Sequence, residues 1–379
     1  AGVAEERRLA LAPGSGARFA VVARALGKTF WRARWARGAR PRWEATAVLR
    51  DLTFVARDLE CLGLLGPNGA GKTTAFRLLT GALDPTSGGA EVAGGPPGGQ
   101  GAAVGYVPQH DVVWPELTVR EHLELFAGLR GARPALAKGL VQRAAELTDL
   151  DGDALGQRAA HLSGGTRRRL SLAVALVGNP RCLFCDEPTT GLDPEARRAV
   201  WRIVERAKRG RCVILTTHSM EEADALCSRI AVVAATRLQC VGTPLHLKAT
   251  YGSGYKLSAS FRAGAGAAGL EALLADARAS WTAEEAYVDS ATYRVVPEAS
   301  LGELFAALDK GAAAAGVSDF ALSQPTLEDA FLNVVAAAER VAAADGERQG
   351  PAGGSPAGAA EPAFNDDDAA AQNKLAGEP

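Results

Sequence analysis

A glycine-rich segment between a predicted strand and a predicted helix is the feature that most constrains what this chain can fold into. Residues 66–73, GPNGAGKT, match the pattern G-x-x-x-x-G-K-[ST], with ECLGLLG before them and KTTAFRLLTGAL after them. A strand that leads through a glycine loop into a helix begins a parallel α/β layer. Two more apolar runs, CLFCD and CVILTTH, are typical of strands buried on both faces of such a sheet.

The glycine-rich segment has the chemistry of a nucleoside triphosphate site. Its glycines let backbone N–H groups converge on phosphate oxygens, and the dipole of the following helix favours negative charge. Lys72 would reach the β- and γ-phosphates, and the Thr73 hydroxyl would bind Mg²⁺. The predicted phosphate-binding residues are Gly66, Pro67, Asn68, Gly69, Ala70, Gly71, Lys72 and Thr73.

The segment LFCDEPTTGLD places two carboxyl groups at the end of a predicted strand. Asp186 can enter a Mg²⁺ shell, and Glu187, on the other side of the strand, can hold or deprotonate an attacking water. His218 ends the next predicted strand, where it can donate a hydrogen bond to a γ-phosphate. Gln109, in YVPQH, carries little information by itself.

A second glycine pair occurs in HLSGGTRRRLSLA, residues 161–173. Glycines ahead of a helix often hold phosphate, yet the chain already has a complete phosphate loop. Taken by itself, the segment fits a spare phosphate site or a basic surface patch. For its three arginines the sequence suggests no more than helix surface and charge beside a phosphate.

Composition narrows the remaining possibilities. The 379 residues are too many for one ordinary core, and a formal net charge of −1 argues against a whole-chain polyanion binder. Most of the six cysteines lie in apolar runs, and an offset of three puts Cys182 and Cys185 on opposite strand faces, which disfavours a metal pair.

No run reaches the roughly 18 to 20 apolar residues of a membrane span. The chain begins with Ala1 and has one methionine, so we expect a piece of a longer protein.

Hydrophobic patterns divide the chain into segments. Residues 1–18 and 341–379 are predicted to be disordered, because they are rich in small residues and lack a sustained period. Residues 19–250 form the nucleotide-binding part, with helical patterns over about residues 110–178. Residues 251–340 show the order β-α-β-β-α-β, which predicts a small ferredoxin-like α+β unit. It ends in an amphipathic helix capped near Thr326, whose apolar face should dock on something, for instance a partner.

Five segments in order, GPNGAGKTT, PQH, LSGGTRRRL, LFCDEPTTGLD and TTHSMEEAD, resemble the nucleotide-binding domain of ATP-binding cassette (ABC) proteins. The resemblance covers roughly Arg18 to Ala338. SRIAVVAATRLQCVGTPLHLKATYGSGY and QPTLEDAFLNV look like the A subfamily of ABC transporters, which export lipids and sterols and carry a small regulatory domain after each cassette. Bacterial drug-resistance cassettes are similar at the same places.

The resemblance implies a P-loop NTPase fold: a RecA-like parallel sheet core, an antiparallel β subdomain and a helical subdomain, followed by the small unit. It also implies residue roles, with ATP and Mg²⁺ as cofactors. The Walker A loop extends to Thr74, Gln109 is the Q-loop residue and a metal contact, Asp186 the magnesium-associated aspartate, Glu187 the catalytic base and His218 the switch histidine. The signature residues are Ser163, Gly164 and Gly165, and Asp193 belongs to the D-loop. Phe30 stands where the family stacks adenine on an aromatic ring.

Residues 31–43, WRARWARGARPRW, depart from the compact turn usual in the family. They fit an exposed basic loop, and alternatively a loop that contacts anionic lipid headgroups or RNA.

The resemblance also implies a second cassette, whose nucleotide the signature would face, and transmembrane domains that touch the Gln109 region. The function expected is ATP hydrolysis that powers transport of a lipid or other hydrophobic substrate, at the cytoplasmic face of a membrane. One alternative is a soluble ABC-type ATPase acting on ribosomes or DNA, although the chain has one Walker A and no sustained heptad run. Another is a regulatory module without turnover, which the presence of Glu187 and His218 argues against. No specific nucleic acid partner is expected.

Overall fold

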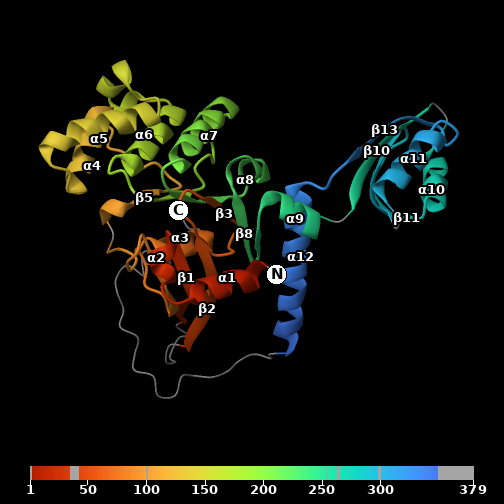
Figure 1. Ribbon diagram of the computed structural model, residues 1–379, viewed down its shortest axis with the longest axis horizontal. Coiled ribbons are helices and arrows are strands. Elements are labelled where there is room, and N and C mark those ends of the chain that lie inside the picture. Colours follow the sequence, from red (N-terminus) through yellow and green to blue (C-terminus); the bar gives the residue numbers. More distant parts are fainter. Residues whose placement is uncertain are drawn as a thin grey trace.

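The computed structural model describes residues 2–34, 42–99, 101–252, 254–262, 265–297 and 300–348. Figure 1 shows a cassette body built on a central sheet, a helical layer above it, and a small α+β unit to one side. A long C-terminal helix, α12 (Leu327–Arg348), runs along the flank of the body.

The central sheet has six strands in the order β5-β6-β7-β3-β8-β9. All neighbours are parallel except β8 and β9, which pair antiparallel. The strands are β3 (Cys61–Leu65), β5 (Val104–Val107), β6 (Cys182–Asp186), β7 (Cys212–Thr217), β8 (Arg229–Ala234) and β9 (Arg237–Gly242). Every residue of β3, β6 and β7 is buried, which explains their continuous apolar sequences and confirms the predicted parallel core.

Two apolar layers cover the two faces of this sheet. On one face α3 (Lys72–Leu79) and the antiparallel sheet pack around Phe184. On the other face α6 (Gly164–Leu176), α7 (Pro194–Lys208) and α8 (Met220–Leu226) pack around Leu183 and Leu215. Cys182 belongs to the first layer and Cys185 to the second, in agreement with the predicted opposite faces.

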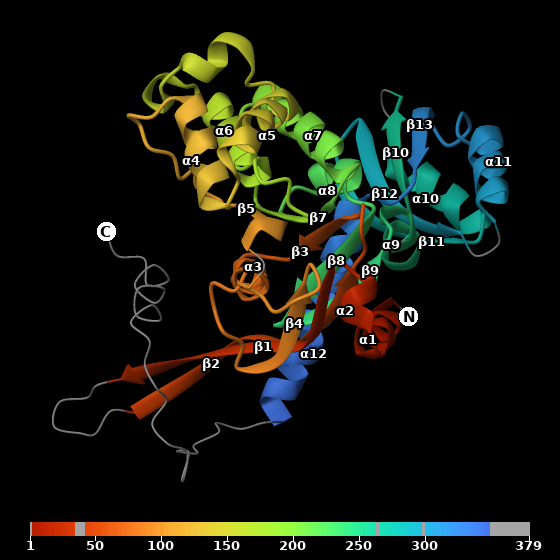
Figure 2. The same ribbon diagram turned by 60° about the vertical axis from the view of Figure 1, so that its left-hand side comes forward.

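The antiparallel β subdomain has three strands in the order β2-β1-β4. β1 (Val21–Arg34) and β2 (Arg42–Ala56) form a long ribbon that extends away from the body in Figure 2, and β4 (Ser87–Val92) pairs with the base of β1. The expectation of a loop over residues 31–43 is therefore wrong for residues 31–34 and 42–43, which lie in these two strands. Trp31 lies opposite Ala45 and Trp43 opposite Ala33, because aromatic and small residues alternate with arginines at the strand period. Residues 35–41 lie outside the described part of the chain.

Most of residues 2–18 are helical, contrary to the prediction of disorder over residues 1–18. They form α1 (Gly2–Leu11) and the short α2 (Ser15–Arg18). The side chain of Glu6, 3% exposed, accepts a hydrogen bond of 2.9 Å from the Val55 N–H and pairs with Arg229 of β8. Alanine, arginine, glutamate and leucine, which dominate α1, all favour helix. The contacts of Glu6 with Val55 and Arg229, which composition does not reveal, hold this helix on the body.

The helical subdomain contains α4 (Val119–Leu129), α5 (Pro134–Leu147) and the side of α6 that carries Leu170 and Ala173, around a core of their own. α4 begins at Thr118, whose side chain exchanges capping hydrogen bonds with Glu121. The remaining short helices of the body are η1 (Gly101–Ala103), η2 (Gly152–Gly156), η3 (Ala159–His161) and α9 (Pro244–Tyr251).

The small C-terminal unit has the predicted ferredoxin-like fold, with strands in the order β11-β12-β10-β13. Its elements are β10 (Tyr255–Phe261), α10 (Ala267–Asp276), β11 (Ala279–Ala286), β12 (Ser290–Pro297), α11 (Leu301–Gly311) and β13 (Val317–Ser323). The unit has a separate core around the fully buried Tyr293. Arg294 of β12 pairs with Asp329 of α12 at 2.9 Å, which ties the unit to the start of that helix.

The apolar face of α12 docks on the cassette of the same chain, whereas the sequence had suggested a partner. Leu327 and Val334 join the second layer of the core, and Val335 and Ala338 pack against Ala234. The helix continues to Arg348, so its C-terminal end lies within the segment 341–379 that was expected to be disordered; residues 349–379 are outside the described part. None of the helices described above combines enough length and apolarity to cross a bilayer.

Candidate functional site

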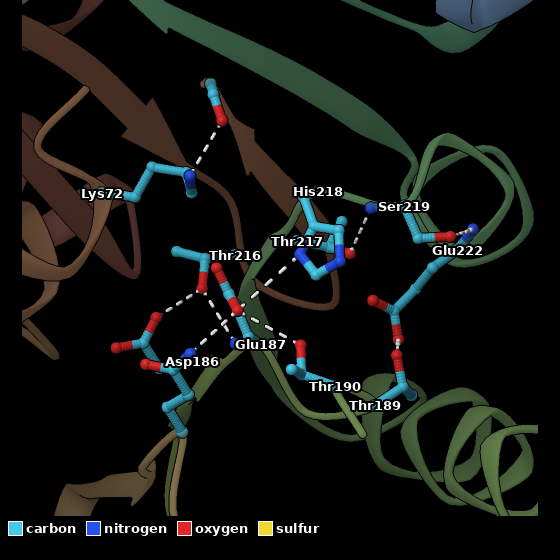
Figure 3. Close-up of polar contacts among 12 residues, drawn as sticks. Lys72, Asp186, Glu187, Thr189, Thr190, Thr216, Thr217, His218, Ser219 and Glu222 are labelled. Atoms are coloured by element: carbon cyan, nitrogen blue, oxygen red, sulfur yellow. Dashed lines mark hydrogen bonds and ion pairs between the residues drawn. The ribbon is translucent and has the colours of Figure 1, made fainter. Parts of the chain in front are cut away.

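Most of the predicted site residues gather at the carboxyl edge of the parallel strands. The glycine-rich loop follows β3, Gln109 follows β5, Asp186 ends β6 with Glu187 next, and His218 follows β7. Parallel strands direct all these ends to one edge of the sheet, where open α/β folds bind ligands. Four segments that are distant in sequence therefore meet at one place. Figure 3 shows Lys72, Asp186, Glu187 and His218 from three of them.

The glycine-rich loop has the backbone that a phosphate cradle requires. Gly69 and Gly71 have φ angles of 79° and 95°, in the left-handed region that favours glycine. A Cβ at Gly71 would lie 2.8 Å from a methyl carbon of Leu49 and 2.9 Å from the Val48 carbonyl oxygen of β2. A larger residue is excluded there because the loop packs directly on the antiparallel sheet.

Lys72 is buried within this loop. Its ammonium donates hydrogen bonds to the carbonyl oxygens of Gly66 at 2.8 Å and Pro67 at 3.2 Å. Burial lowers the pKa of Lys72, and the charges of Glu187 and Asp186 oppose that shift. The ammonium is thus held by two neutral carbonyls in a loop rich in N–H groups, an arrangement that suits an anionic phosphate.

Asp186 is a buried carboxyl held by hydroxyl groups. Thr216 of β7 donates to Asp186 Oδ1 at 2.6 Å, and the Tyr106 hydroxyl lies 3.5 Å from Oδ2. Burial raises the pKa of Asp186, while hydrogen bonds from Thr216 and Thr73 lower it. Sequence reasoning missed Thr216 and Tyr106 as partners of Asp186; the signal for Thr216 was a pair of threonines at the end of an otherwise apolar strand.

The residues at this edge fit a Mg²⁺ ion that substrate phosphates help to hold better than a metal ion held by protein side chains alone. Within the described ranges, no three His, Cys, Asp or Glu side chains come together as a metal-binding group. Mg²⁺ is usually held by one or two carboxylates together with substrate phosphates and waters. The Asp186 carboxyl and the Thr73 hydroxyl, which lowers the pKa of that carboxyl, fit this pattern.

Glu187 is the centre of a polar cluster on the other side of the strand end. Its Oε2 accepts hydrogen bonds from Gln109 Nε2 at 3.1 Å and Thr190 Oγ1 at 3.2 Å, and lies 3.7 Å from His218 Nδ1. Its backbone has a φ of 45°, which is strained for a residue with a side chain. The Glu187 N–H donates to the carbonyl and hydroxyl oxygens of Thr216, at 3.1 and 3.0 Å, and these bonds hold the strained conformation.

A buried glutamate contacts the two segments that follow Glu187 and His218 (Figure 3). Glu222 of α8, with no exposed surface, accepts hydrogen bonds from Thr189 Oγ1 at 2.9 Å and Trp201 Nε1 at 3.1 Å. Its own N–H donates to Ser219 Oγ at 3.3 Å, in the turn after His218. Burial raises the pKa of Glu222, although hydrogen bonds from Thr217, Thr189 and Trp201 oppose the shift.

Glu222 leads to a prediction about stability and pH. A raised pKa in the folded state means that the folded protein binds a proton more tightly than the unfolded chain. The contribution of protonated Glu222 to the free energy of unfolding is complete below the pKa of this group in the unfolded chain. It is lost as the pH rises through the pKa of Glu222 in the folded protein. Replacing Glu222 with Gln removes this titration, so above that window we expect the variant to be more stable than wild type, by about 1.4 kcal/mol for each unit of the shift.

Urea unfolding of wild type and Glu222→Gln at several pH values from 4 to 9 measures this difference. Glu221→Gln, at an exposed neighbouring glutamate, is the control and should show no pH-dependent difference from wild type. Parallel pH dependences of wild type and Glu222→Gln would contradict the prediction.

The glycine pair of the signature segment lies in a different place. Ser163 caps α6, with its Oγ accepting from the Thr166 N–H at 3.2 Å, and Gly164 and Gly165 form the first turn. They line a surface hollow of about 510 Å³ together with Asp193, which caps α7. None of residues 66–74 lines this hollow. The signature segment therefore does not join the glycine-rich loop of its own chain.

Phe30 lies in β1, half-buried against the first apolar layer. The Lys28 ammonium is 5.2 Å from the centroid of its ring. Strand β2, which pairs with β1, is the strand that contacts Gly71. The ring is thus on the ribbon next to the glycine-rich loop.

A family model described as "ABC transporter" matches residues 49–190. The "ABC transporter A family member 7" of Arabidopsis thaliana is 38% identical over 296 residues, covering 76% of this chain and 31% of that protein. Member 9 of the same family and organism is 40% identical over 295 residues, covering 75% of this chain and 31% of the relative. The chain thus spans about a third of the length of these relatives.

Solved structures resemble the cassette part of the chain. The structure of an ATP-binding subunit of an ABC transporter aligns with a TM-score of 0.51 and 26% identity, covering 61% of this chain and 92% of that subunit. A dimeric ATP-binding cassette in a post-hydrolysis state, bound to ADP and Pi, aligns with a TM-score of 0.50, covering 59% of this chain and 98% of the other. With 20% identity, the second likeness concerns the fold alone.

Proposed function

Since the chain belongs to the ABC transporter family, we propose that it is a Mg²⁺-dependent ATPase cassette, which powers transport across a membrane by ATP-dependent dimerisation with a second cassette. The observation that carries this proposal is the meeting of Lys72, Asp186, Glu187 and His218 at one sheet edge, while the signature glycines line a separate hollow. This separation of the phosphate-binding residues from the signature glycines fits a nucleotide site to which two chains contribute.

In this proposal the glycine-rich loop, from Gly66 to Thr74, holds the ATP phosphates through its N–H groups. Lys72 would exchange its two carbonyl partners for phosphate oxygens, and Phe30 would stack on adenine. Thr73, Asp186 and Gln109 would hold Mg²⁺, which supplies positive charge against the phosphate oxygens. Their hydroxyl, carboxylate and amide groups are oxygen ligands of the kind that Mg²⁺ prefers.

Glu187 is proposed as the general base for the attacking water. Its carboxylate lies among donors from three segments, Gln109, Thr190 and His218, which orient it at the end of β6. A positioned base contributes roughly 10²- to 10⁴-fold to a rate. His218, with its side chain 60% exposed, can donate a hydrogen bond to the γ-phosphate from the same side.

The separate hollow supports the proposed dimerisation. Ser163, Gly164 and Gly165, with Asp193 beside them, are proposed to bind the nucleotide on the Walker A loop of the second cassette. A hydrogen bond to a charged group contributes roughly 1.5 to 3 kcal/mol. Several such bonds at two γ-phosphates exceed the ~5.5 kcal/mol that moves an equilibrium from 1:99 to 99:1. Loss of the γ-phosphate removes these bonds, so hydrolysis reopens the dimer.

The remaining parts of the proposal rest on the likeness to A family members. The substrate proposed is a lipid or another hydrophobic molecule, carried by transmembrane domains that touch the Gln109 region. The cassette is proposed to lie at the cytoplasmic face of that membrane. The small unit of residues 251–340 is proposed to be regulatory.

Mixing two inactive variants tests whether each site needs two chains. Lys72→Ala removes the phosphate lysine, and Gly164→Asp blocks the signature; a side chain at Gly164 meets no atom within 4 Å, so the fold should persist. In a mixed dimer, one site has both an intact Lys72 and an intact Gly164. We expect the mixture to hydrolyse ATP several-fold faster than either variant alone, measured as phosphate release.

Lys72→Ala mixed with Glu187→Gln is the matched control. Both changes damage the Walker A side, so no intact site forms and no recovery is expected. If the Lys72→Ala and Gly164→Asp mixture also shows no recovery, while wild type hydrolyses ATP, the two-chain site is wrong.

A further inference from the structure

The three arginines after the signature glycines have different surroundings in the structure. Arg167 is half-buried and donates one hydrogen bond, of 3.3 Å, to the Leu162 carbonyl. Arg169 bonds the Asp149 carbonyl at 2.8 Å and the Thr166 hydroxyl at 3.1 Å. Arg168 is only 3% exposed, and its guanidinium extends from α6 into the body between two loops.

One side of the Arg168 guanidinium binds the loop that carries the catalytic carboxylate. Nε donates to the Pro188 carbonyl at 2.7 Å, and Nη2 donates to the carbonyls of Glu187 at 3.0 Å and Asp186 at 3.3 Å. Three consecutive carbonyls at the end of β6 are therefore held by one side chain. The middle residue is Glu187, whose φ of 45° needs such support.

The other side of the guanidinium binds the loop that carries Gln109. Nη1 donates to the Pro108 carbonyl at 2.6 Å and forms an ion pair with Asp111 Oδ1 at 3.0 Å. Asp111 also accepts a hydrogen bond of 2.8 Å from Ser171, one turn further along α6. Arg168 thus holds residues on both sides of Gln109 in the chain, Pro108 and Asp111. Gln109 in turn donates a hydrogen bond to Glu187.

We propose that Arg168 is a positioning residue, which links the position of the signature helix to the geometry of Glu187 and Gln109 in the same chain. The proposal rests on the proposed function, in which Ser163 and Glu187 of one chain serve two different ATP molecules. Arg168 would then connect the two sites of a dimer. ATP bound against one chain's signature would set the catalytic geometry of that chain's own Walker A site.

The physical basis is the rigidity of the connection. Arg168 lies five residues after Ser163 on one continuous helix, so a shift of the helix start moves the guanidinium with it. Guanidinium is planar, with five N–H donors in a fixed fork, and here it makes five hydrogen bonds to two loops. Lysine has a single nitrogen and cannot span both loops. Misplacement by about 1 Å is enough to lower a rate by ~10²-fold.

The test compares Arg168→Gln, Arg168→Lys and Arg167→Gln in the 379-residue chain. For each variant, fluorescent-nucleotide titration measures ATP affinity, and phosphate release gives kcat and the Hill coefficient for ATP. For Arg168→Gln we expect an affinity within about twofold of wild type, because Lys72 and the glycine-rich loop are unchanged. Its kcat should fall at least tenfold, and its Hill coefficient should fall to about 1, since the sites no longer communicate.

Arg168→Lys should fall between wild type and Arg168→Gln, because charge is kept and the fork is lost. Arg167→Gln, at the matched arginine one position earlier, should keep the wild-type kcat and Hill coefficient. A wild-type kcat and Hill coefficient in Arg168→Gln would overturn the proposal, as would a loss of kcat with an unchanged Hill coefficient, which indicates a purely local role.

Asp111→Asn provides a milder change in case Arg168→Gln does not fold. It weakens one of the five bonds and keeps the carbonyl contacts, so the fold should persist. We expect a smaller decrease of both kcat and the Hill coefficient, and unchanged values of both would overturn the proposal. Absence of ATP hydrolysis or of an ATP-dependent dimer in wild type would instead contradict the proposed function, which keeps the two failures distinct.

Discussion

Glu187→Gln is expected to lower kcat for ATP hydrolysis by about 10²- to 10⁴-fold and to leave a stable ATP-dependent dimer. The amide of glutamine has the shape of the carboxylate but cannot take a proton from water. Its oxygen can still accept from Gln109 and Thr190, which contact Glu187 at 3.1 and 3.2 Å, so the local structure should be preserved. The γ-phosphate then persists, and with it the proposed signature contacts that close the dimer.

Phosphate release measures the rate, and light scattering after gel filtration with and without ATP measures the dimer. Glu221→Gln, an exposed glutamate in the first turn of α8, is the control and should keep wild-type turnover. Normal turnover by Glu187→Gln would remove Glu187 from the mechanism. Loss of turnover without an ATP-dependent dimer would contradict the proposed link between γ-phosphate and dimerisation.

Arg229→Ala is expected to lower the free energy of unfolding by about 3–5 kcal/mol, the usual cost of leaving buried charges without a partner. Arg229, on β8, pairs with Glu6 of α1 and with Glu60 at 3.0 Å, and the carboxylate side chains are only 4% and 6% exposed. Burial already raises the pKa of Glu6, and the charge of Arg229 opposes that shift. Without the guanidinium, both carboxyl groups stay buried and α1 loses its anchor.

The midpoint of urea unfolding reports this loss, and limited proteolysis shows whether α1 detaches first. Arg7→Ala is the matched control, because Arg7 pairs with Asp51 at 2.8 Å on the surface, with 55% and 35% of the side chains exposed. Such exposed pairs contribute about 0–1 kcal/mol. Equal effects of the two substitutions would show that the buried pairing of α1 contributes no more than a surface contact.

The fold of the cassette was largely predictable because its chemistry demands particular residues at strand ends. A triphosphate loop needs a strand, glycines with positive φ and a lysine in that order, so GPNGAGKT located β3 and α3. In the same way, two carboxyl groups after an apolar run allowed strand β6 to be predicted. Short-range order also revealed the β-α-β-β-α-β unit, since its elements alternate within a few dozen residues.

Three of the failures share one physical cause, a contact with a distant segment. Composition made residues 1–18 look disordered, yet Glu6 is held by Val55 and Arg229. The face of α12 was recognised as a docking surface, and only the structure shows that it packs on Ala234 of the same chain. Thr216 and Tyr106 were missed as partners of Asp186 because both reach it from neighbouring strands of the sheet, a contact that the order of residues along the chain does not show.

The sequence by itself determined which groups can do chemistry here: a lysine in a glycine loop, two carboxyl groups after a strand, and a serine with two glycines before a helix. The tertiary structure decided which of these groups act together. Glu187 meets Gln109 and His218, whereas Ser163 lies apart from the glycine-rich loop. Of three consecutive arginines it also selected Arg168, because a helix sends successive side chains in different directions and only this one enters the interior.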